Sequence, residues 1–162
     1  LSFEKLNANK VSVQHEEVNV CELIEYAIEE LESIRKEGQR ILYKKGEFPC
    51  VFYSDGKILK NILLNLLSNG LKYSGETGKV LVTLNDEEDR LALSVEDDGI
   101  GIPEKDQANM FERFHRAENV SNIQGTGLGL NIVKKYVELL NGSIRFESEL
   151  GKGTIFYIEL PK

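Results

Sequence analysis

Asparagine side chains recur at helical spacing in the stretch 55–73, DGKILKNILLNLLSNGLKY. At about 100° per residue, Asn61, Asn65, Asn69 and Lys72 fall on one polar stripe of a helix whose other sides are mostly leucine and isoleucine. A carboxamide on such a largely buried helix must find hydrogen-bond partners or costs about 1–3 kcal/mol. A bound ligand could supply those partners, although asparagines that simply face solvent would give the same pattern.

The polar groups in and beyond this stretch indicate what such a ligand would need. Asp97 ends a predicted strand directly before a glycine turn, and an ionised carboxylate only accepts hydrogen bonds. An exocyclic amine would be a suitable partner, but an ordinary turn aspartate would also occupy such a position. Neutral carboxamide oxygens suit a hard cation such as Mg²⁺, with water and phosphate oxygens completing the octahedron.

Two glycine-rich stretches, DDGIGIP at 97–103 and GTGLGL at 125–130, allow a close approach of the backbone to a ligand. Neither is the GxxxxGK[ST] phosphate loop or the GxGxxG of dinucleotide-binding folds. GTGLGL nevertheless opens directly into a predicted helix, where free N–H groups and the positive end of the helix dipole favour an anion such as phosphate. Glycines of a flexible turn are the alternative interpretation.

The elements that position these residues follow from hydrophobic periodicity. It predicts helices over 21–36, 55–73 and 128–140, with a short helix starting at Pro103 and Glu104. Strands are predicted over 11–20, 40–44, 50–53, 79–84, 90–96, 143–148 and 154–160. This order predicts an α+β fold, a two-layer sandwich in which helices pack on one face of a mixed, mostly antiparallel sheet. The polar and glycine-rich stretch 110–131 is predicted to be a functional lid or disordered.

Size and composition describe one globular domain. The chain has 162 residues, 41% hydrophobic and 29% charged. This length is sufficient for a hydrophobic core that needs no stabilising cross-links. Residues 1–10 have the apolar spacing of the tail of a preceding helix or a linker, and 11–162 are predicted to form the domain. A net charge of −7 disfavours nucleic-acid binding. Cys21 and Cys50 lack CxxC spacing, so we expect buried free thiols in a reducing compartment, without zinc or a disulfide scaffold.

Four motifs, in this order, resemble the catalytic and ATP-binding domain of bacterial sensor histidine kinases, within the wider family of Bergerat-fold ATPases. NLLSNGLKYS at 65–74 is similar to the asparagine box and DDGIGIP at 97–103 to the first glycine box. FERFHR at 111–116 is similar to the phenylalanine box and GTGLGLNIV at 125–133 to the second glycine box. The closing GSIRFESELGKGTIFYIELP is similar to the final strands of the family, so the resemblance covers about 11–162.

The resemblance implies that the asparagine box binds the phosphate end of Mg·ATP. Asn69 is then the ligand of Mg²⁺, with Asn65 beside it, Lys72 at a phosphate and Tyr73 at the nucleoside. Arg116 is then the residue that reaches the γ-phosphate. Asn65, Lys72 and Arg116 form the implied catalytic set.

The glycine boxes are implied to bind the two ends of the nucleotide. Asp97 takes the adenine amino group, and Gly99 and Gly101 make room for the base, with Ile102 and Thr154 also at the nucleotide. The lid presents its backbone to the phosphates through Gly125, Thr126, Gly127, Leu128 and Gly129.

The sequence departs from the family pattern at Gly70, where alanine is usual, and at His115, where tyrosine is common and which we interpret as a packing substitution. His15 precedes Glu16 and faintly resembles a phosphoacceptor pair, but its flanking residues do not match. Asn61 lies one turn before the family box, and we interpret it as structural or solvent-facing.

The implied function is a protein histidine kinase that binds ATP and Mg²⁺ and transfers the γ-phosphoryl group to a histidine on a separate dimerisation domain. The implied partners are that domain of the same parent protein and a response regulator receiver domain. We expect a cytoplasmic, monomeric fragment without nucleic-acid or membrane contacts, from a homodimeric parent that could be membrane-bound. The alternatives are an ATP-driven clamp of the topoisomerase and mismatch-repair type and a nucleotide-binding module without catalysis.

Overall fold

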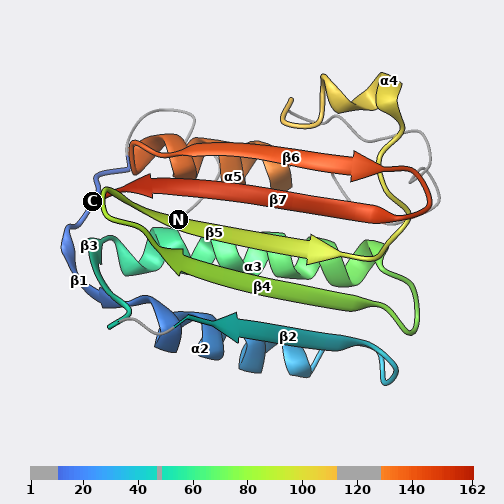
Figure 1. The fold of residues 1–162 in the computed structure, drawn as a ribbon, viewed down its shortest axis with the longest axis horizontal. Coiled ribbons are helices and arrows are strands. Elements are labelled where there is room, and N and C mark those ends of the chain that lie inside the picture. Colours follow the sequence, from blue (N-terminus) through green and yellow to red (C-terminus); the bar gives the residue numbers. More distant parts are fainter. Residues whose placement is uncertain (1–10, 47–48, 113–128) are drawn as a thin grey trace.

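The computed structural model describes residues 11–46, 49–112 and 129–162. It has two layers, with three long helices behind one face of a five-stranded sheet (Figure 1). The strands in spatial order are β2 (Arg40–Lys45), β4 (Lys79–Asp86), β5 (Arg90–Asp97), β7 (Gly153–Pro161) and β6 (Ser143–Glu149). Only β2 and β4 are parallel, and the remaining neighbours are antiparallel. The predicted fold class is therefore confirmed.

The helices behind the sheet are α2 (Val20–Glu32), α3 (Gly56–Tyr73) and α5 (Gly129–Leu139). Their bounds agree with the predicted helices except at the end of α2. The short α4 (Glu104–Gln107) begins where a helix start was predicted, after Pro103. No helix in the described part of the chain is long and apolar enough to cross a membrane.

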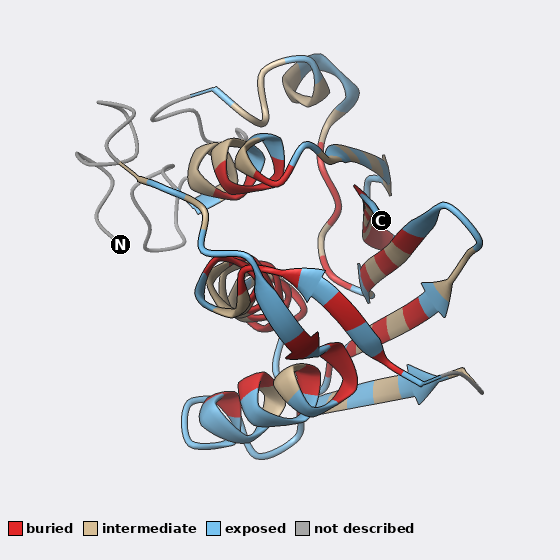
Figure 2. Cartoon of the chain, turned by 90° about the vertical axis from the view of Figure 1, so that its left-hand side faces the viewer, coloured by how far each residue is buried: buried red, intermediate tan, exposed pale blue. Residues whose placement is uncertain are grey.

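Helix α3 lies between the other two long helices and is buried on most of its circumference (Figure 2). Its first turn is capped by Asp55, which is 4% exposed and accepts hydrogen bonds from the backbone N–H groups of Lys57 at 3.0 Å and Ile58 at 3.1 Å. The other carboxylate oxygen accepts from the backbone N–H of Gln14 at 2.8 Å. Asp55 thus caps the helix and joins it to the preceding chain.

The opposite end of α3 is closed by the side chain of Gln39, which is 1% exposed. Its Nε2 donates to the carbonyl oxygens of Leu71 and Gly75, both at 2.7 Å. Its Oε1 accepts from the N–H of Lys36 at 2.9 Å. A helix C-terminus leaves carbonyls without intrahelical partners, so Gln39 satisfies the groups at the end of α3.

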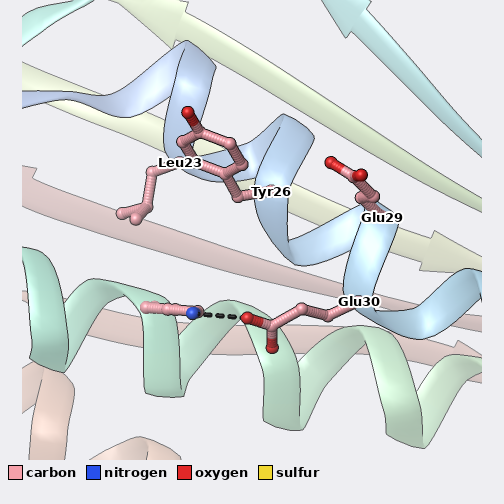
Figure 3. A pocket seen from close by; sticks show the side chains of 5 residues that line it. Leu23, Tyr26, Glu29 and Glu30 are labelled. Atoms are coloured by element: carbon pink, nitrogen blue, oxygen red, sulfur yellow. Dashed lines mark ion pairs between the residues drawn. The ribbon is translucent and has the colours of Figure 1, made fainter.

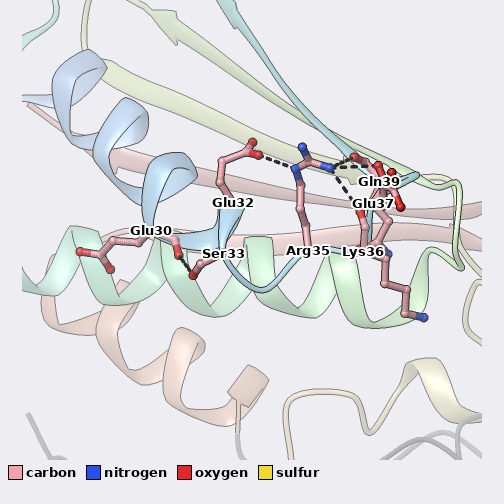
Figure 4. Close-up of polar contacts among 7 residues, drawn as sticks. All are labelled: Glu30, Glu32, Ser33, Arg35, Lys36, Glu37 and Gln39. Carbon is pink, nitrogen blue, oxygen red and sulfur yellow. Dashed lines mark hydrogen bonds and ion pairs between the residues drawn. The ribbon is translucent and has the colours of Figure 1, made fainter.

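The end of α2 differs from the prediction, because the helix stops at Glu32 rather than near residue 36. The guanidinium of Arg35 turns back and donates to the carbonyl oxygens of Lys36 and Glu37 at 3.2 Å and of Gln39 at 2.8 Å (Figure 4). These bonds stabilise a non-helical turn that the apolar spacing did not reveal. This turn places Gln39 next to the C-terminal end of α3.

The N-terminal strand is also shorter than the predicted 11–20. Only β1 (Glu16–Asn19) pairs, and it forms a separate two-stranded antiparallel sheet with β3 (Val51–Ser54). The chain becomes helical at Val20 because the side chain of Asn19 caps α2 by accepting from the N–H of Glu22 at 3.1 Å.

The expectation of free thiols is wrong. Cys21 and Cys50 form a disulfide, with Cα atoms 5.6 Å apart, and both residues are buried as expected. The N–H of Val20 donates to the carbonyl oxygen of Cys50 at 2.9 Å, which holds the two backbone segments together. A sequence separation of 29 residues gave no indication of this pairing.

Candidate functional site

A row of polar side chains crosses the helix-facing side of the sheet at one end. In the register, Ser148 on β6 lies opposite Thr154 on β7, and Thr154 lies opposite Asp97 on β5. Asp97 in turn lies opposite Val80 on β4. The alternating residues before Asp97 and after Thr154 on the same face are apolar and buried, so the row marks where the core ends and a polar site begins.

The carboxylate of Asp97 is held by backbone N–H groups. Its Oδ1 accepts from the N–H of Gly99 at 2.9 Å, and the N–H of Thr154 is a second donor to this carboxylate. The pKa of Asp97 is raised to about 6, mainly by burial; the neighbouring charge of Asp98 contributes to the rise, and the two N–H donors oppose it. A carboxylate with a raised pKa at the edge of the core is a candidate for ligand recognition.

The end of α3 meets the glycine turn beside Asp97. The N–H of Ile100 donates to the carbonyl oxygen of Tyr73 at 3.2 Å, and a β-carbon at Gly99 would overlap that same carbonyl. One turn before Tyr73 in α3, a β-carbon at Gly70 would lie 3.0 Å from Val80 Cγ2 and 3.7 Å from Asp97 Cβ. Small residues therefore bring α3 close to the polar row.

The same turn is fastened to the β6–β7 hairpin. Gly101 has φ +72°, which favours glycine, and a β-carbon there would also overlap the carbonyl oxygen of Glu149. The N–H of Gly151 donates to the carbonyl oxygen of Ile100 at 2.8 Å. Ile102 is buried and packs with Tyr73 and other apolar side chains in a small separate cluster.

The polar stripe of α3 is half-buried. Asn61 and Asn65 each donate from Nδ2 to the backbone carbonyl four residues earlier, at 2.9 Å and 2.7 Å. The side chain of Asn69 makes no hydrogen bond with any residue in the described ranges. Lys72, in the last turn, places its Nζ 5.6 Å from the ring centroid of Tyr73.

Helix α5 begins beside this stripe. A β-carbon at Gly129 would lie 3.7 Å from Asn65 Oδ1, so the N-terminus of α5 and the middle of α3 are neighbours. Asn131, in the first turn of α5, donates from Nδ2 to the carbonyl oxygen of Phe111 at 2.9 Å. The Phe111 ring packs edge-on against Phe146, with centroids 5.6 Å apart.

The structure thus brings together most of the predicted site residues that it describes. One group, around the polar row, contains Tyr73, Asp97, Gly99, Gly101, Ile102 and Thr154. A second contact joins Asn65 to Gly129, and α3 connects the two through Asn69 and Lys72. The predicted residues Arg116, Gly125, Thr126, Gly127 and Leu128 lie outside the described residues, as does His115.

A groove of about 310 Å³ lies on another part of the surface, between α2 and α3 (Figure 3). It is lined by Leu23, Tyr26, Glu29, Glu30 and Lys60. Lys60 Nζ lies 2.5 Å from Glu30 Oε1, so the charge of this lysine is paired within the protein. Among the predicted site residues that the structure describes, none lines this groove.

Sequence reasoning missed the residues that hold the site in place. Ser148 and Gln107 bind the glycine turn to the hairpin, since Ser148 accepts from the N–H of Ile102 at 2.8 Å. Gln107 Nε2 donates to the carbonyl oxygens of Ile102 at 3.1 Å and Ser148 at 3.2 Å. The only sequence signal was the polar residue at 148 on the apolar face of an alternating strand.

Comparison with known proteins identifies the family of this chain. Residues 54–162 match the family described as histidine kinase-, DNA gyrase B- and HSP90-like ATPases. The chain belongs to this family. The matched region contains the asparagine stripe, both glycine-rich stretches and the polar row of the ATPase domain. The N-terminal segment with β1 and α2 lies outside the match.

Relatives and solved structures similar to this chain include sensor histidine kinases. The chain is 43% identical over 114 residues to the circadian input-output histidine kinase CikA of Synechococcus elongatus, covering 69% of the chain and 15% of CikA. It is 32% identical over 165 residues to the sensor histidine kinase WalK of Bacillus subtilis, covering 99% of the chain and 27% of WalK. The chain therefore spans less than a third of either relative.

The fold agrees with solved kinase structures. The catalytic domain of histidine kinase ThkA superposes with a TM-score of 0.81 at 30% identity, covering 92% of the chain and 96% of that structure. Full-length ShkA in complex with AMPPNP superposes with a TM-score of 0.85 at 30% identity, covering 98% of the chain and 33% of that structure. The predicted membership among catalytic domains of two-component sensor histidine kinases is confirmed.

Proposed function

We propose that this domain binds Mg·ATP between α3, the polar row and the N-terminus of α5, and transfers the γ-phosphoryl group to a histidine on a separate domain. The supporting observation is that α3 contacts both partners: its end packs against the glycine turn beside Asp97, and its Asn65 lies against Gly129 at the start of α5. The complex of ShkA with AMPPNP, a structure with the same fold, adds support for a nucleotide there.

The base end of the proposed site is the polar row. Asp97 accepts a hydrogen bond from the adenine amino group, while its own backbone donors hold the carboxylate in place. Ile102 and Tyr73 form an apolar wall. Gly99 and Gly101 keep the turn close to α3 and to the hairpin and so leave room for the base.

The phosphate end is the polar stripe of α3 with the start of α5. Asn69 fits a Mg²⁺ ligand because its carboxamide is half-buried and makes no hydrogen bond within the described residues. Asn65, which lies beside Gly129, and Lys72 are proposed to contact the phosphates, and Arg116 is proposed for the γ-phosphate. The backbone of residues 125–129 is proposed to bind the phosphate tail.

In the proposed reaction a histidine nitrogen of the partner domain attacks the γ-phosphorus. The bond from that phosphorus to the β–γ bridging oxygen breaks, and ADP leaves with the electron pair. Catalysis of phosphoryl transfer is mainly positioning and charge neutralisation, so Lys72, Arg116 and a cation held by Asn69 are the groups that matter. The proposed partners are the dimerisation domain of the same parent and a receiver domain.

The test combines the 162-residue chain with a histidine-bearing helical hairpin of a sensor kinase, ATP labelled at the γ-phosphate, and Mg²⁺. Label on the hairpin, lost when its histidine is replaced by glutamine, is the expected result. Dimerisation of the chain on ATP without labelling would instead identify a clamp-type ATPase. Binding without either would identify a non-catalytic module.

A further inference from the structure

The hydroxyl of Ser148 is the junction of three hydrogen bonds in the polar row. Its Oγ accepts from the N–H of Ile102 at 2.8 Å and donates to the carbonyl oxygen of Gly153 at 3.0 Å. It also lies 2.8 Å from Thr154 Oγ1. Ser148 therefore contacts both the glycine turn and the strand that carries Thr154.

Proton counting fixes the direction of the third bond. A serine hydroxyl has one proton, and the Gly153 carbonyl, which has none to give, takes it. The bond between the two hydroxyls must then use the proton of Thr154, which donates to Ser148 Oγ. Ser148 accepts two bonds and donates one, so its hydrogen-bonding capacity is filled.

This direction determines what Thr154 offers to a ligand. With its proton directed to Ser148, Thr154 Oγ1 has only lone pairs left; Thr154 is the register partner of Asp97, and its backbone N–H donates to the Asp97 carboxylate. Two acceptors side by side favour a base that presents an amino group and disfavour one that presents a carbonyl oxygen. A Thr154 hydroxyl that could turn would lose this discrimination, because it could donate to the carbonyl.

We infer that Ser148 is a positioning residue that sets base selectivity, by holding the Thr154 hydroxyl as an acceptor beside Asp97. The inference rests on the proposed function, since it places the base of the nucleotide at the polar row. Ser148 acts through Thr154 and through the backbone of Ile102, and no contact of Ser148 with the nucleotide is required.

The test measures the affinities of the 162-residue chain for ATP and for inosine triphosphate, which carries a carbonyl in place of the amino group. Ser148→Ala should lower the ratio of the affinity for ATP to the affinity for inosine triphosphate by roughly 5- to 10-fold, the effect expected of one misdirected hydrogen bond. Ser148→Thr, which keeps the hydroxyl, should restore the ratio. Ser94→Ala, on the opposite face of the same sheet, is the matched control and should leave the ratio unchanged.

A double-mutant cycle distinguishes this role from a general loss of structure. In the Thr154→Val background the threonine proton is gone, so Ser148→Ala should have no further effect on the ratio. The inference would be overturned if Ser148→Ala lowered the affinity for both nucleotides equally. It would also be overturned if Ser148→Ala changed the ratio by as much in the Thr154→Val background as in the unmodified chain. If Ser148→Ala does not fold, Ser148→Cys takes its place, because a thiol is a weak hydrogen-bond partner, would hold the Thr154 proton less well and should also lower the ratio.

The controls also separate this inference from the proposed function. An unmodified chain that binds neither triphosphate contradicts the proposed function, and the inference with it. An unmodified chain that prefers ATP, together with an unchanged ratio in Ser148→Ala, contradicts only the role of Ser148.

Discussion

At the scale of single residues, Asp97 combines two properties that oppose each other. Its side chain is half-buried at the edge of the core, and burial raises its pKa to about 6 from the ordinary 3.8. Two backbone donors nevertheless hold the carboxylate in a fixed orientation. The ionised form of Asp97 therefore lowers the stability of the fold, but it provides an acceptor where a ligand could use it.

We predict opposite pH dependences of stability and of binding at Asp97. The folded-state pKa is raised, so the contribution of Asp97 to stability is fully present below the unfolded pKa of 3.8 and is lost as the pH rises through about 6. Binding of the adenine amino group needs the ionised form, so ATP affinity should rise over the same range. Calorimetric titrations between about pH 5 and pH 7.5 measure this rise.

Asp97→Asn is the matched variant for that experiment, because it keeps the shape and removes the titration. It should weaken ATP binding at least roughly tenfold, as expected for the loss of a hydrogen bond to a charged group, and flatten the pH profile relative to the unmodified chain. An unchanged ATP affinity at neutral pH would contradict the assignment of Asp97 to the base.

For Asn69 we predict an effect that depends on the cation. Asn69→Ala should lower ATP affinity on the order of tenfold with Mg²⁺ present, about 1.4 kcal/mol, and leave it unchanged in excess EDTA. Asn61→Ala, on the same stripe but bonded to the carbonyl of Lys57, is the control and should have little effect in either buffer. Equal losses with and without Mg²⁺ would show that Asn69 does not bind the cation.

At the scale of elements, α3 carries the asparagines and is fixed at both ends by side chains from elsewhere in the chain. Asp55 closes its N-terminus and Gln39 its C-terminus. The last turn, with Lys72 and Tyr73, therefore has a defined position against the glycine turn. The capping aspartate is visible in the sequence, whereas the glutamine, 32 residues before its partner Leu71, is not.

We predict that Gln39 matters for stability far more than an exposed glutamine does. Gln39→Ala leaves the buried carbonyl of Leu71 and the part-buried carbonyl of Gly75 without these donors, so the free energy of unfolding should fall by about 1–3 kcal/mol. Gln39→Glu should not restore it, because a carboxylate cannot donate. Urea unfolding measures the change, with Gln14→Ala at the exposed surface as the control. A loss below about 0.5 kcal/mol would contradict this account.

At the scale of the whole molecule, a disulfide links the helix layer to the segment that enters the small β1–β3 sheet. The Cys21–Cys50 disulfide ties the start of α2 to the chain that enters β3. It closes a loop with a sequence separation of 29 residues, for which chain entropy predicts a stabilisation of about 3 kcal/mol.

We therefore predict that a reductant lowers the free energy of unfolding by about 3 kcal/mol, measured by urea titration with and without dithiothreitol. The Cys21→Ala, Cys50→Ala double variant should have the lower stability in both buffers. Protein that has been kept without reductant and still shows two titratable thiols after denaturation would show that the bond does not form.

The sequence by itself determined the central helix and the hairpins, and it indicated the candidate site residues. Those features are local, since the period of apolar residues, the capping Asp55 and the glycine turns act within a few positions of one another. The identity of Asp97 as a site candidate also came from its local setting, a strand end before glycines.

Only the tertiary structure decided which distant residues meet. The early end of α2, the Gln39 cap, the Cys21–Cys50 disulfide and the Ser148 junction all depend on pairs far apart in the chain. Whether a hydroxyl, amide or thiol is paired depends on what the fold brings within about 3 Å of it. No periodicity encodes that distance, so the acceptors that would face a base emerged only once β5, β6 and β7 lay side by side.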